Sequence, residues 1–300
     1  MDKIKIIFLG TGSAIPTAKR NHPAVLLQYR DENILVDCGE GVQRQFRIAK
    51  INPVKLTRVL ITHWHGDHVL GLPGLIQTLM LNGYNKILKI YGPAGTKKMM
   101  ELYIRLFAHK GRDIKIEVNE IDKGIFADEK DFFISAEEME HDTPCLAYSF
   151  NVKERSRIDK NKLDKLGIKG KIIGELARGK IIMVNGKKIN LEKLIYKEAG
   201  RKIVFVMDTV YNPKIEKFAI DADLMICEAT YSSDKEDLAK EYMHLTTKQA
   251  CLIAKKAKVK ELFLTHFSQR QGENSKKILK EARHIFRKAE VAEDLKNIIL

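Results

Sequence analysis

Residues 59–68, Val-Leu-Ile-Thr-His-Trp-His-Gly-Asp-His, join an apolar run directly to a cluster of polar side chains. The apolar run has the pattern of a buried strand. Alternate side chains of an extended segment lie on the same side, so we expect His63 and His65 to face together. The glycine that follows permits a turn, after which Asp67 and His68 can face a second point nearby. Neutral imidazoles and carboxylates suit zinc and its neighbouring metals. The stretch therefore predicts a metal site, with further ligands supplied by other parts of the chain.

Length and composition indicate a globular chain with a sizeable core. Of the 300 residues, 44% are hydrophobic, 31% are charged and seven are prolines, which excludes collagen-like, mucin-like and wholly disordered proteins. The apolar run at the N-terminus is too short for a signal peptide, and no apolar run approaches a membrane span. Cys38, Cys145, Cys227 and Cys251 are scattered without a CxxC pair, so we expect reduced thiols. These features predict a cytoplasmic protein with no membrane partner.

The apolar runs predict two halves of similar style. In the first half we expect a meander of strands over 5–9, 25–29 and 34–37, then strands over 58–62 and 87–91 separated by a helix over 72–81. In the second half we expect strands over 203–207, 224–227 and 262–265 and helices over 246–256 and 275–288. The segments 59–63 and 262–266 are both apolar strands that end in Thr-His. Chance could produce this likeness, but so could two related halves that each donate a histidine from a strand end.

The segment 151–196 between these halves is strongly basic. It contains ten lysines and three arginines against two aspartates and three glutamates, so its net charge of +8 is more than half of the +14 of the chain. It also contains five glycines and no proline or histidine. Two interpretations stay open: a solvated mobile loop, or an arm that grips the phosphates of a nucleic acid.

Three further polar residues are candidate ligands because of their position. Asp208 directly follows the apolar run 203–207, and His266 follows 262–265. His141 lies in a polar turn before the apolar run 146–150. An acid or a histidine at the end of a buried strand is in a position typical of a site, although each of them alone could equally be a structural residue.

The pattern His63-x-His65-x-Asp67-His68, followed in order by the three separate ligands, resembles the metallo-β-lactamase superfamily. Within it, the chain resembles the ribonuclease Z family in its short form. Further motifs extend the resemblance along nearly the whole chain, at 16–21, 35–41, 228–230, 244–246 and 265–270. The resemblance implies an α/β fold, the αββα sandwich of two mixed β-sheets flanked by helices, as a single domain over 1–300. It also implies that 151–196 is an inserted, flexible, tRNA-binding arm.

The resemblance implies roles for individual residues as well. One metal ion would be held by His63, His65 and His141, the other by Asp67, His68 and His266, with Asp208 bridging them. The implied cofactor is Zn²⁺, two ions per subunit, with Mn²⁺ as an alternative. Asp67 would also orient the attacking hydroxide, and His244, polarised by Glu228, would protonate the departing 3′-oxygen. The residues expected to contact the substrate are Lys19, Arg20, Asn21, Arg270, Lys169 and Lys171.

The activity implied is removal of the 3′ trailer from precursor tRNA. The cut would fall after the discriminator nucleotide and leave a 3′-hydroxyl on the tRNA and a 5′-phosphate on the trailer. The resemblance further implies a homodimer. The net charge of +14 is what a nucleic-acid partner favours.

Three other functions are alternatives to this one. A dinucleotide site at Gly10-Thr11-Gly12-Ser13 fails because Ile15 stands where the third glycine of the motif belongs. A non-catalytic RNA-binding protein would explain the charge but not the clustered ligands. The remaining alternative is a phosphodiesterase of the same superfamily that acts on a small or another nucleic-acid substrate, and the basic segment argues against a small one.

Overall fold

The computed structural model describes residues 2–107, 114–177, 182–184, 187–189, 191–271 and 275–300. The chain divides into two compact units. The smaller unit is Asn151–Arg201, and the larger one is formed by Asp2–Phe150 together with Lys202–Leu300. Within the described ranges, no helix has the length and apolar character needed to cross a membrane.

The larger unit contains two β-sheets. One has the strand order β18-β1-β2-β3-β4-β5-β6, with bounds Asn297–Ile299, Ile4–Gly10, Ala24–Tyr29, Glu32–Val36, Arg58–Leu60, Ile87–Gly92 and Lys115–Glu120. The other has the order β17-β16-β15-β14-β9-β8-β7, with bounds Ala289–Val291, Glu261–Thr265, Leu224–Glu228, Arg201–Val206, Cys145–Val152, Phe132–Met139 and Gly124–Asp128. Both sheets are mixed: β1–β2–β3 and β7–β8 are antiparallel, whereas β3–β4–β5–β6 and β14–β15–β16–β17 are parallel.

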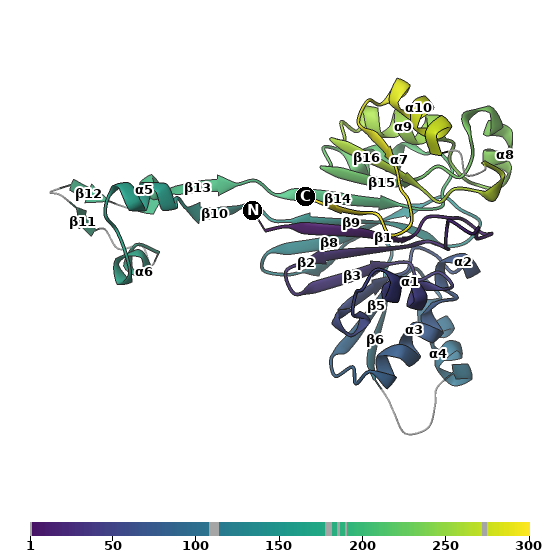
Figure 1. Cartoon of the computed structure of the whole chain (residues 1–300), viewed down its shortest axis with the longest axis horizontal. Coiled ribbons are helices and arrows are strands. Elements are labelled where there is room, and N and C mark those ends of the chain that lie inside the picture. Colours follow the sequence, from purple (N-terminus) through teal and green to yellow (C-terminus); the bar gives the residue numbers. More distant parts are fainter. Residues whose placement is uncertain (1, 108–113, 178–181, 185–186, 190, 272–274) are drawn as a thin grey trace. The chain divides into compact units, whose positions relative to one another are not determined.

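Helices cover the outer faces of both sheets (Figure 1). Beside the first sheet lie α1 (Val42–Ile48), α3 (Leu72–Leu81) and α4 (Thr96–Phe107), and beside the second lie α7 (Pro213–Ala219), α9 (Thr247–Lys256) and α10 (Ser275–Ile285). An apolar cluster fills each sheet–helix layer. Between the sheets, the rings of Phe8 and Phe263 stack with centroids 5.5 Å apart. The predicted αββα sandwich is therefore confirmed.

Local signals account for most of the predicted elements. The predicted helix over 72–81 is α3 with the same bounds. α9 begins after Thr246, whose side chain forms a capping box with Gln249. The four cysteines are buried free thiols, as expected.

The predicted meander is confirmed as β1–β2–β3, and the strands that follow are parallel because α1 and α3 connect them as crossovers. One helix is shorter than expected. α10 ends at Ile285 and not at residue 288, because the chain turns there, with the Ala289 N–H donating to the Phe286 carbonyl, and enters β17.

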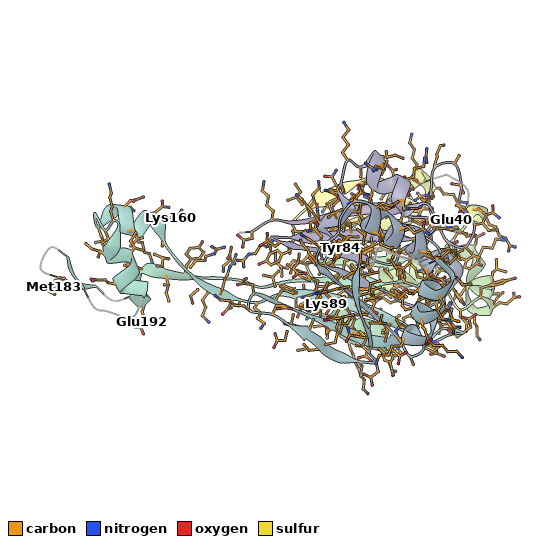
Figure 2. All side chains as sticks on the ribbon, turned by 90° about the horizontal axis from the view of Figure 1, so that it is seen from below. Glu40, Tyr84, Lys89, Lys160, Met183 and Glu192 are labelled. Atoms are coloured by element: carbon orange, nitrogen blue, oxygen red, sulfur yellow. The ribbon has the colours of Figure 1, made fainter. Side chains whose placement is uncertain are left out.

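The smaller unit is folded and not an irregular loop in its described part (Figure 2, where Lys160, Met183 and Glu192 are labelled). β10 (Arg155–Ile158) pairs antiparallel with β13 (Ile195–Glu198), and β11 (Ile182–Val184) pairs with β12 (Lys187–Ile189). α5 (Lys160–Lys165) is capped by Asp159 and is followed by α6 (Lys171–Ala177). Leu163, Ile168 and Leu194 form a small core. The chain enters this unit after β9 and leaves it into β14, the neighbour of β9 in the sheet.

Candidate metal centre

The candidate ligands follow the carboxyl ends of strands. His63 comes three residues after β4, His141 follows β8, Asp208 follows β14 and His266 follows β16. Side chains of different strands meet where parallel strands end, which is the usual place for a site in an α/β sheet. The two segments that end in Thr-His thus lie in different sheets and bring their histidines to one place.

One group of ligand atoms is formed by His63, His65, His141 and Asp208, whose donor atoms lie within 4.8 Å of one another. His65 Nδ1 lies 3.0 Å from His63 Nε2 and 3.3 Å from His141 Nε2. Asp208 Oδ2 lies 3.6 Å from His63 Nε2. The three predicted histidines therefore converge with the carboxylate.

A second group is formed by Asp67, His68 and His266. The Nε2 atoms of His68 and His266 are 3.2 Å apart, and Asp67 Oδ2 lies 3.3 Å from His68 Nε2. Asp208 also reaches this group, because its Oδ1 lies 3.1 Å from His266 Nε2. Asp208 is thus placed between the two groups, as a bridging ligand must be.

The donor set fits divalent metal ions. The ligand atoms of five imidazoles and two carboxylates lie close to one another. Imidazole nitrogens and carboxylate oxygens are common protein ligands of divalent metal ions. Asp208 Oδ1 is fully buried, yet no group among the described residues donates a hydrogen bond to it. A buried carboxylate oxygen without a donor is costly unless a cation satisfies it.

The protonation states of the metal-free site favour ligation at His63 and Asp208. Burial lowers the pKa of His63 well below its usual value, which leaves the imidazole neutral. Burial raises the pKa of Asp208, but the charges of His266 and His68 outweigh this and hold it well below its usual range. Neutral imidazole and ionised carboxylate are the forms that bind a metal. At His68, burial lowers the pKa, but the charges of Asp208 and Asp67 outweigh it and raise the pKa well above its usual value, so this ring must lose a proton when a metal binds.

Contacts behind the ligands fix the orientation of their rings. His68 Nδ1 lies 2.8 Å from Asp37 Oδ2, and Thr230 Oγ1 lies 2.8 Å from His266 Nδ1. His141 Nδ1 donates to the carbonyl of Met243 at 3.1 Å. Such partners set the tautomer of a ligating histidine. Asp37 and Thr230 were not among the predicted site residues, although Asp37 ends a predicted strand and Asp208 directly follows one.

Beside the ligands, His244 faces a buried carboxylate. Its Nδ1 lies 3.2 Å from both oxygens of Glu228, which also accepts hydrogen bonds from the Thr209 N–H at 2.7 Å and the Thr230 hydroxyl at 2.5 Å. Burial lowers the pKa of His244, but Glu228 and Asp208 outweigh it and raise the pKa to about 9. In the metal-free site the imidazole is therefore protonated at neutral pH.

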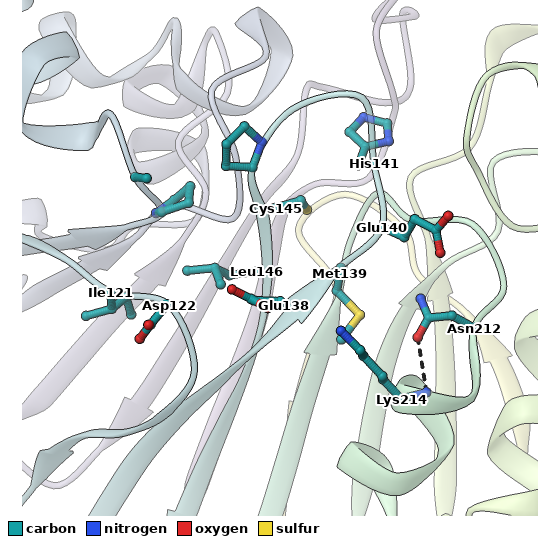
Figure 3. Close-up of a pocket in the computed structure, with 13 residues that line it drawn as sticks. Ile121, Asp122, Glu138, Met139, Glu140, His141, Cys145, Leu146, Asn212 and Lys214 are labelled. Carbon is teal, nitrogen blue, oxygen red and sulfur yellow. Dashed lines mark hydrogen bonds between the residues drawn. The ribbon is translucent and has the colours of Figure 1, made fainter.

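Two cavities adjoin the cluster. One of about 350 Å³ is lined by ligands from both groups and by His244, Ser268 and Arg270. The other, of about 510 Å³, shares only His141 with the metal cluster and carries the carboxylates of Asp122, Glu138 and Glu140 (Figure 3). The smaller cavity is the better place for the scissile phosphate, because ligands of both groups, His244 and the guanidinium of Arg270 line it together.

The predicted substrate residues lie in different settings. Lys19 and Arg270 are exposed, and Asn21 donates from Nδ2 to the Glu40 carbonyl at 2.6 Å. Lys169 is exposed in the smaller unit, and the side chain of Lys171 lies outside what the structure describes.

Arg20 differs from these, because only 8% of its surface is exposed. Its guanidinium donates to the Thr11 hydroxyl, the Ala292 carbonyl and the Ser275 hydroxyl, and lies 4.5 Å from the ring of Phe267. In this position it braces the 16–21 loop from inside.

Comparison with known proteins assigns the chain to a family. A sequence profile of the Anti-Pycsar protein Apyc1 family matches residues 4–105, less than half of the chain. The ribonuclease Z of Methanothermobacter thermautotrophicus is 38% identical over 297 residues, which cover 98% of this chain and 96% of that protein. The ribonuclease Z of Listeria monocytogenes serotype 4a is 37% identical over 300 residues, which cover 97% and 98%. The chain belongs to the ribonuclease Z family.

Solved structures agree with this assignment. The crystal structure of human tRNase Z, short form, matches with a TM-score of 0.71 and 27% identity over 98% of both chains. The metallo-β-lactamase fold protein YhfI of Bacillus subtilis matches with a TM-score of 0.73 at 20% identity over the whole of both chains, which shows the shared fold. The chain is therefore a ribonuclease Z-type enzyme with a divalent metal centre.

Proposed function

We propose that this ribonuclease Z-type enzyme removes the 3′ trailer from precursor tRNA by one cut after the discriminator nucleotide. The observation that carries the proposal is the convergence of two ligand groups through Asp208 beside the His244–Glu228 pair. When bound, two divalent cations supply an activated water and neutralise charge on the phosphodiester. The residues that would hold them are His63, His65 and His141 on one side and Asp67, His68 and His266 on the other, with Asp208 shared. We propose Zn²⁺ as the metal, with Mn²⁺ as an alternative.

His244 supports the proposal as the proton donor to the departing 3′-oxygen. Its Nδ1 is turned to Glu228, so the proton available to the substrate is the one on Nε2. The buried Glu228 favours the imidazolium form. Asp67 belongs to the second ligand group, and its carboxylate is ionised because the charges of His68 and His266 outweigh burial and lower its pKa. It can therefore orient the attacking water by accepting its hydrogen bond.

The basic segment supports a large, phosphate-rich substrate and makes a small-molecule phosphodiesterase the weaker alternative. We propose that 151–196 binds tRNA as an arm, with Lys169 and Lys171 among its contacts, and that Lys19, Asn21 and Arg270 contact RNA near the cut. Lysines that bind phosphates release counterions, so this binding weakens as salt rises.

Incubation of the metal-loaded enzyme with a 3′-extended precursor tRNA tests the proposal. We expect one chelator-sensitive cut after the discriminator nucleotide, with a 3′-hydroxyl on the tRNA. Hydrolysis of bis(p-nitrophenyl) phosphate without any cut in the tRNA would instead favour a phosphodiesterase with another substrate.

Replacement of the shared ligand should remove metal. We expect Asp208→Asn to lower the metal content of the purified protein by more than about half, because the neutral amide weakens ligation to both ions. Elemental analysis measures this directly. Asp234→Asn, at an exposed acid outside both ligand groups, is the matched control; equal metal content in the two variants would contradict the bridging role.

We also propose that the enzyme is a homodimer that associates through α3 and α4. Leu81 and Leu106 are 69% and 72% exposed, and Leu102 and Phe107 are also exposed. They lie on the two helices that line an apolar cavity of about 240 Å³. Large apolar side chains exposed on two neighbouring helices are typical of an interface.

The double variant Leu81→Lys, Leu106→Lys should dissociate the dimer, because a buried unpaired charge costs several kcal/mol. In sedimentation velocity, the mass of the double variant should be half that of the wild type. Ile220→Lys, at a half-exposed position on the other helical layer, should leave the mass unchanged. A monomeric wild type would overturn this part of the proposal.

A further inference from the structure

Aromatic side chains form one wall of the 350 Å³ cavity. Tyr231 and Tyr242 line it together with His244. The ring centroids of Tyr231 and His244 are 5.9 Å apart, and those of Tyr231 and Tyr242 are 6.4 Å apart, with 32° between the latter two ring planes. Tyr231 is only 8% exposed, whereas Tyr242 is 49% exposed. A row of rings therefore leads from the proposed proton donor outward to an open aromatic face.

Backbone contacts hold this row in place. Tyr231 forms a bridge with Thr246, and its carbonyl accepts from the Thr247 N–H at 2.9 Å. Tyr242 ends α8 (Glu236–Glu241), with its N–H donating to the Leu238 carbonyl at 3.1 Å. Among the described residues, none forms a hydrogen bond with the Tyr242 hydroxyl. The exposed ring is thus positioned by its backbone, and its hydroxyl has no structural task there.

We propose that Tyr242, backed by Tyr231, stacks on the base of the discriminator nucleotide. This inference rests on the proposed function. The departing 3′-oxygen belongs to the discriminator nucleotide, and His244 must reach that oxygen, so the rings next to His244 meet this nucleotide and not the trailer. Proteins recognise unpaired RNA bases by stacking them on aromatic side chains. Every base has a π-face, so this contact accepts all four discriminator bases.

The chemistry of the wall supports the choice of a base over a phosphate. Two phenol rings carry no charge to pair with a phosphate, whereas the guanidinium of Arg270 on another part of the same cavity does. The cavity therefore has separate surfaces for the scissile phosphate and for the adjoining base.

A thermodynamic cycle between enzyme and substrate tests the stacking. With intact precursor tRNA, we expect Tyr242→Ala to lower kcat/KM about 5–100-fold and Tyr242→Phe to restore most of it, because the phenyl ring keeps the stacking face. With a precursor that is abasic at the discriminator position, kcat/KM of the wild type should fall by a similar factor. On this abasic precursor, kcat/KM of Tyr242→Ala should be only slightly lower than that of the wild type. A precursor that is abasic at the first trailer nucleotide should retain the full effect of Tyr242→Ala.

A fluorescent reporter separates stacking from a structural effect. 2-Aminopurine at the discriminator position should be quenched on binding to the wild type and to Tyr242→Phe, and not on binding to Tyr242→Ala. Tyr211→Ala, at a tyrosine of 38% exposure that does not line this cavity, should behave as wild type. If the losses in kcat/KM from Tyr242→Ala and from the abasic discriminator multiply, the ring and the base act independently and the stacking proposal is wrong. The proposed trailer cleavage would still stand in that case. Failure of the wild type to cut any precursor would overturn the proposed function itself.

Discussion

His244→Ala should slow single-turnover cleavage of precursor tRNA by about 10²–10⁴-fold while the metal content stays at the wild-type level. The variant removes the imidazolium that Glu228 stabilises, so the departing 3′-oxygen must leave without a positioned proton donor. The metal content should stay unchanged because His244 belongs to neither of the two proposed ligand groups, and Asp208, which they share, remains. Rapid-quench kinetics and elemental analysis on the same sample check both parts of the expectation.

The leaving group provides the sharper control. A precursor with a bridging 3′-sulfur at the cleavage site leaves as a thiolate, which needs no proton, so His244→Ala should regain most of the lost rate on it. His284→Ala, at an exposed histidine of α10, should match the wild type on both substrates. An unchanged rate of His244→Ala on the normal precursor would refute the proton-donor role.

Removal of the smaller unit should separate substrate binding from chemistry. We expect a chain in which a short glycine–serine linker replaces residues 153–198 to lose at least about 100-fold in kcat/KM on precursor tRNA, because the phosphate contacts of a segment of charge +8 are gone. Hydrolysis of bis(p-nitrophenyl) phosphate should persist, since every candidate ligand lies in the larger unit. The linker joins β9 to its neighbour β14, so the sheet can remain intact.

A charge variant distinguishes the basic side chains from the fold of the unit. Lys160→Gln, Lys165→Gln and Lys169→Gln together should weaken tRNA binding and lower its dependence on salt, because three exposed charges are removed. Lys255→Gln with Lys258→Gln, at exposed positions of the larger unit, is the comparison. Loss of both activities in the deletion chain would contradict a role confined to gripping the substrate.

Much of the metal centre could be predicted without coordinates, because its signals are local. The alternation of a strand places His63 and His65 on one side, and the short distance in sequence to Asp67 and His68 keeps all four residues in one region. Buried strands are recognisable by their apolar runs, so the acids and histidines at their ends, such as Asp208 and His266, could be singled out. The bounds of α3, and those of α9 to within one residue, followed from the spacing of apolar residues in the same way.

The order of the strands in the sheets determines contacts that these local signals could not predict. Thr230 reaches His266 because β15 and β16 are parallel neighbours, and Asp37 reaches His68 across a crossover. Nothing in the local pattern reports such distant pairings. The family resemblance implied Arg20 as a substrate contact, yet the tertiary structure buries it against the C-terminal segment, where it supports the 16–21 loop.

The residue types of the chain thus determined which chemistry it can perform, because ligand softness, charge and strand periodicity belong to the side chains and their order. Only the tertiary structure decided how that chemistry is arranged: which ligands Asp208 joins, which carboxylate holds His244, and which tyrosine presents an open face to the cavity. These are contacts between segments far apart in the chain, and they exist only once the two sheets bring their strand ends together.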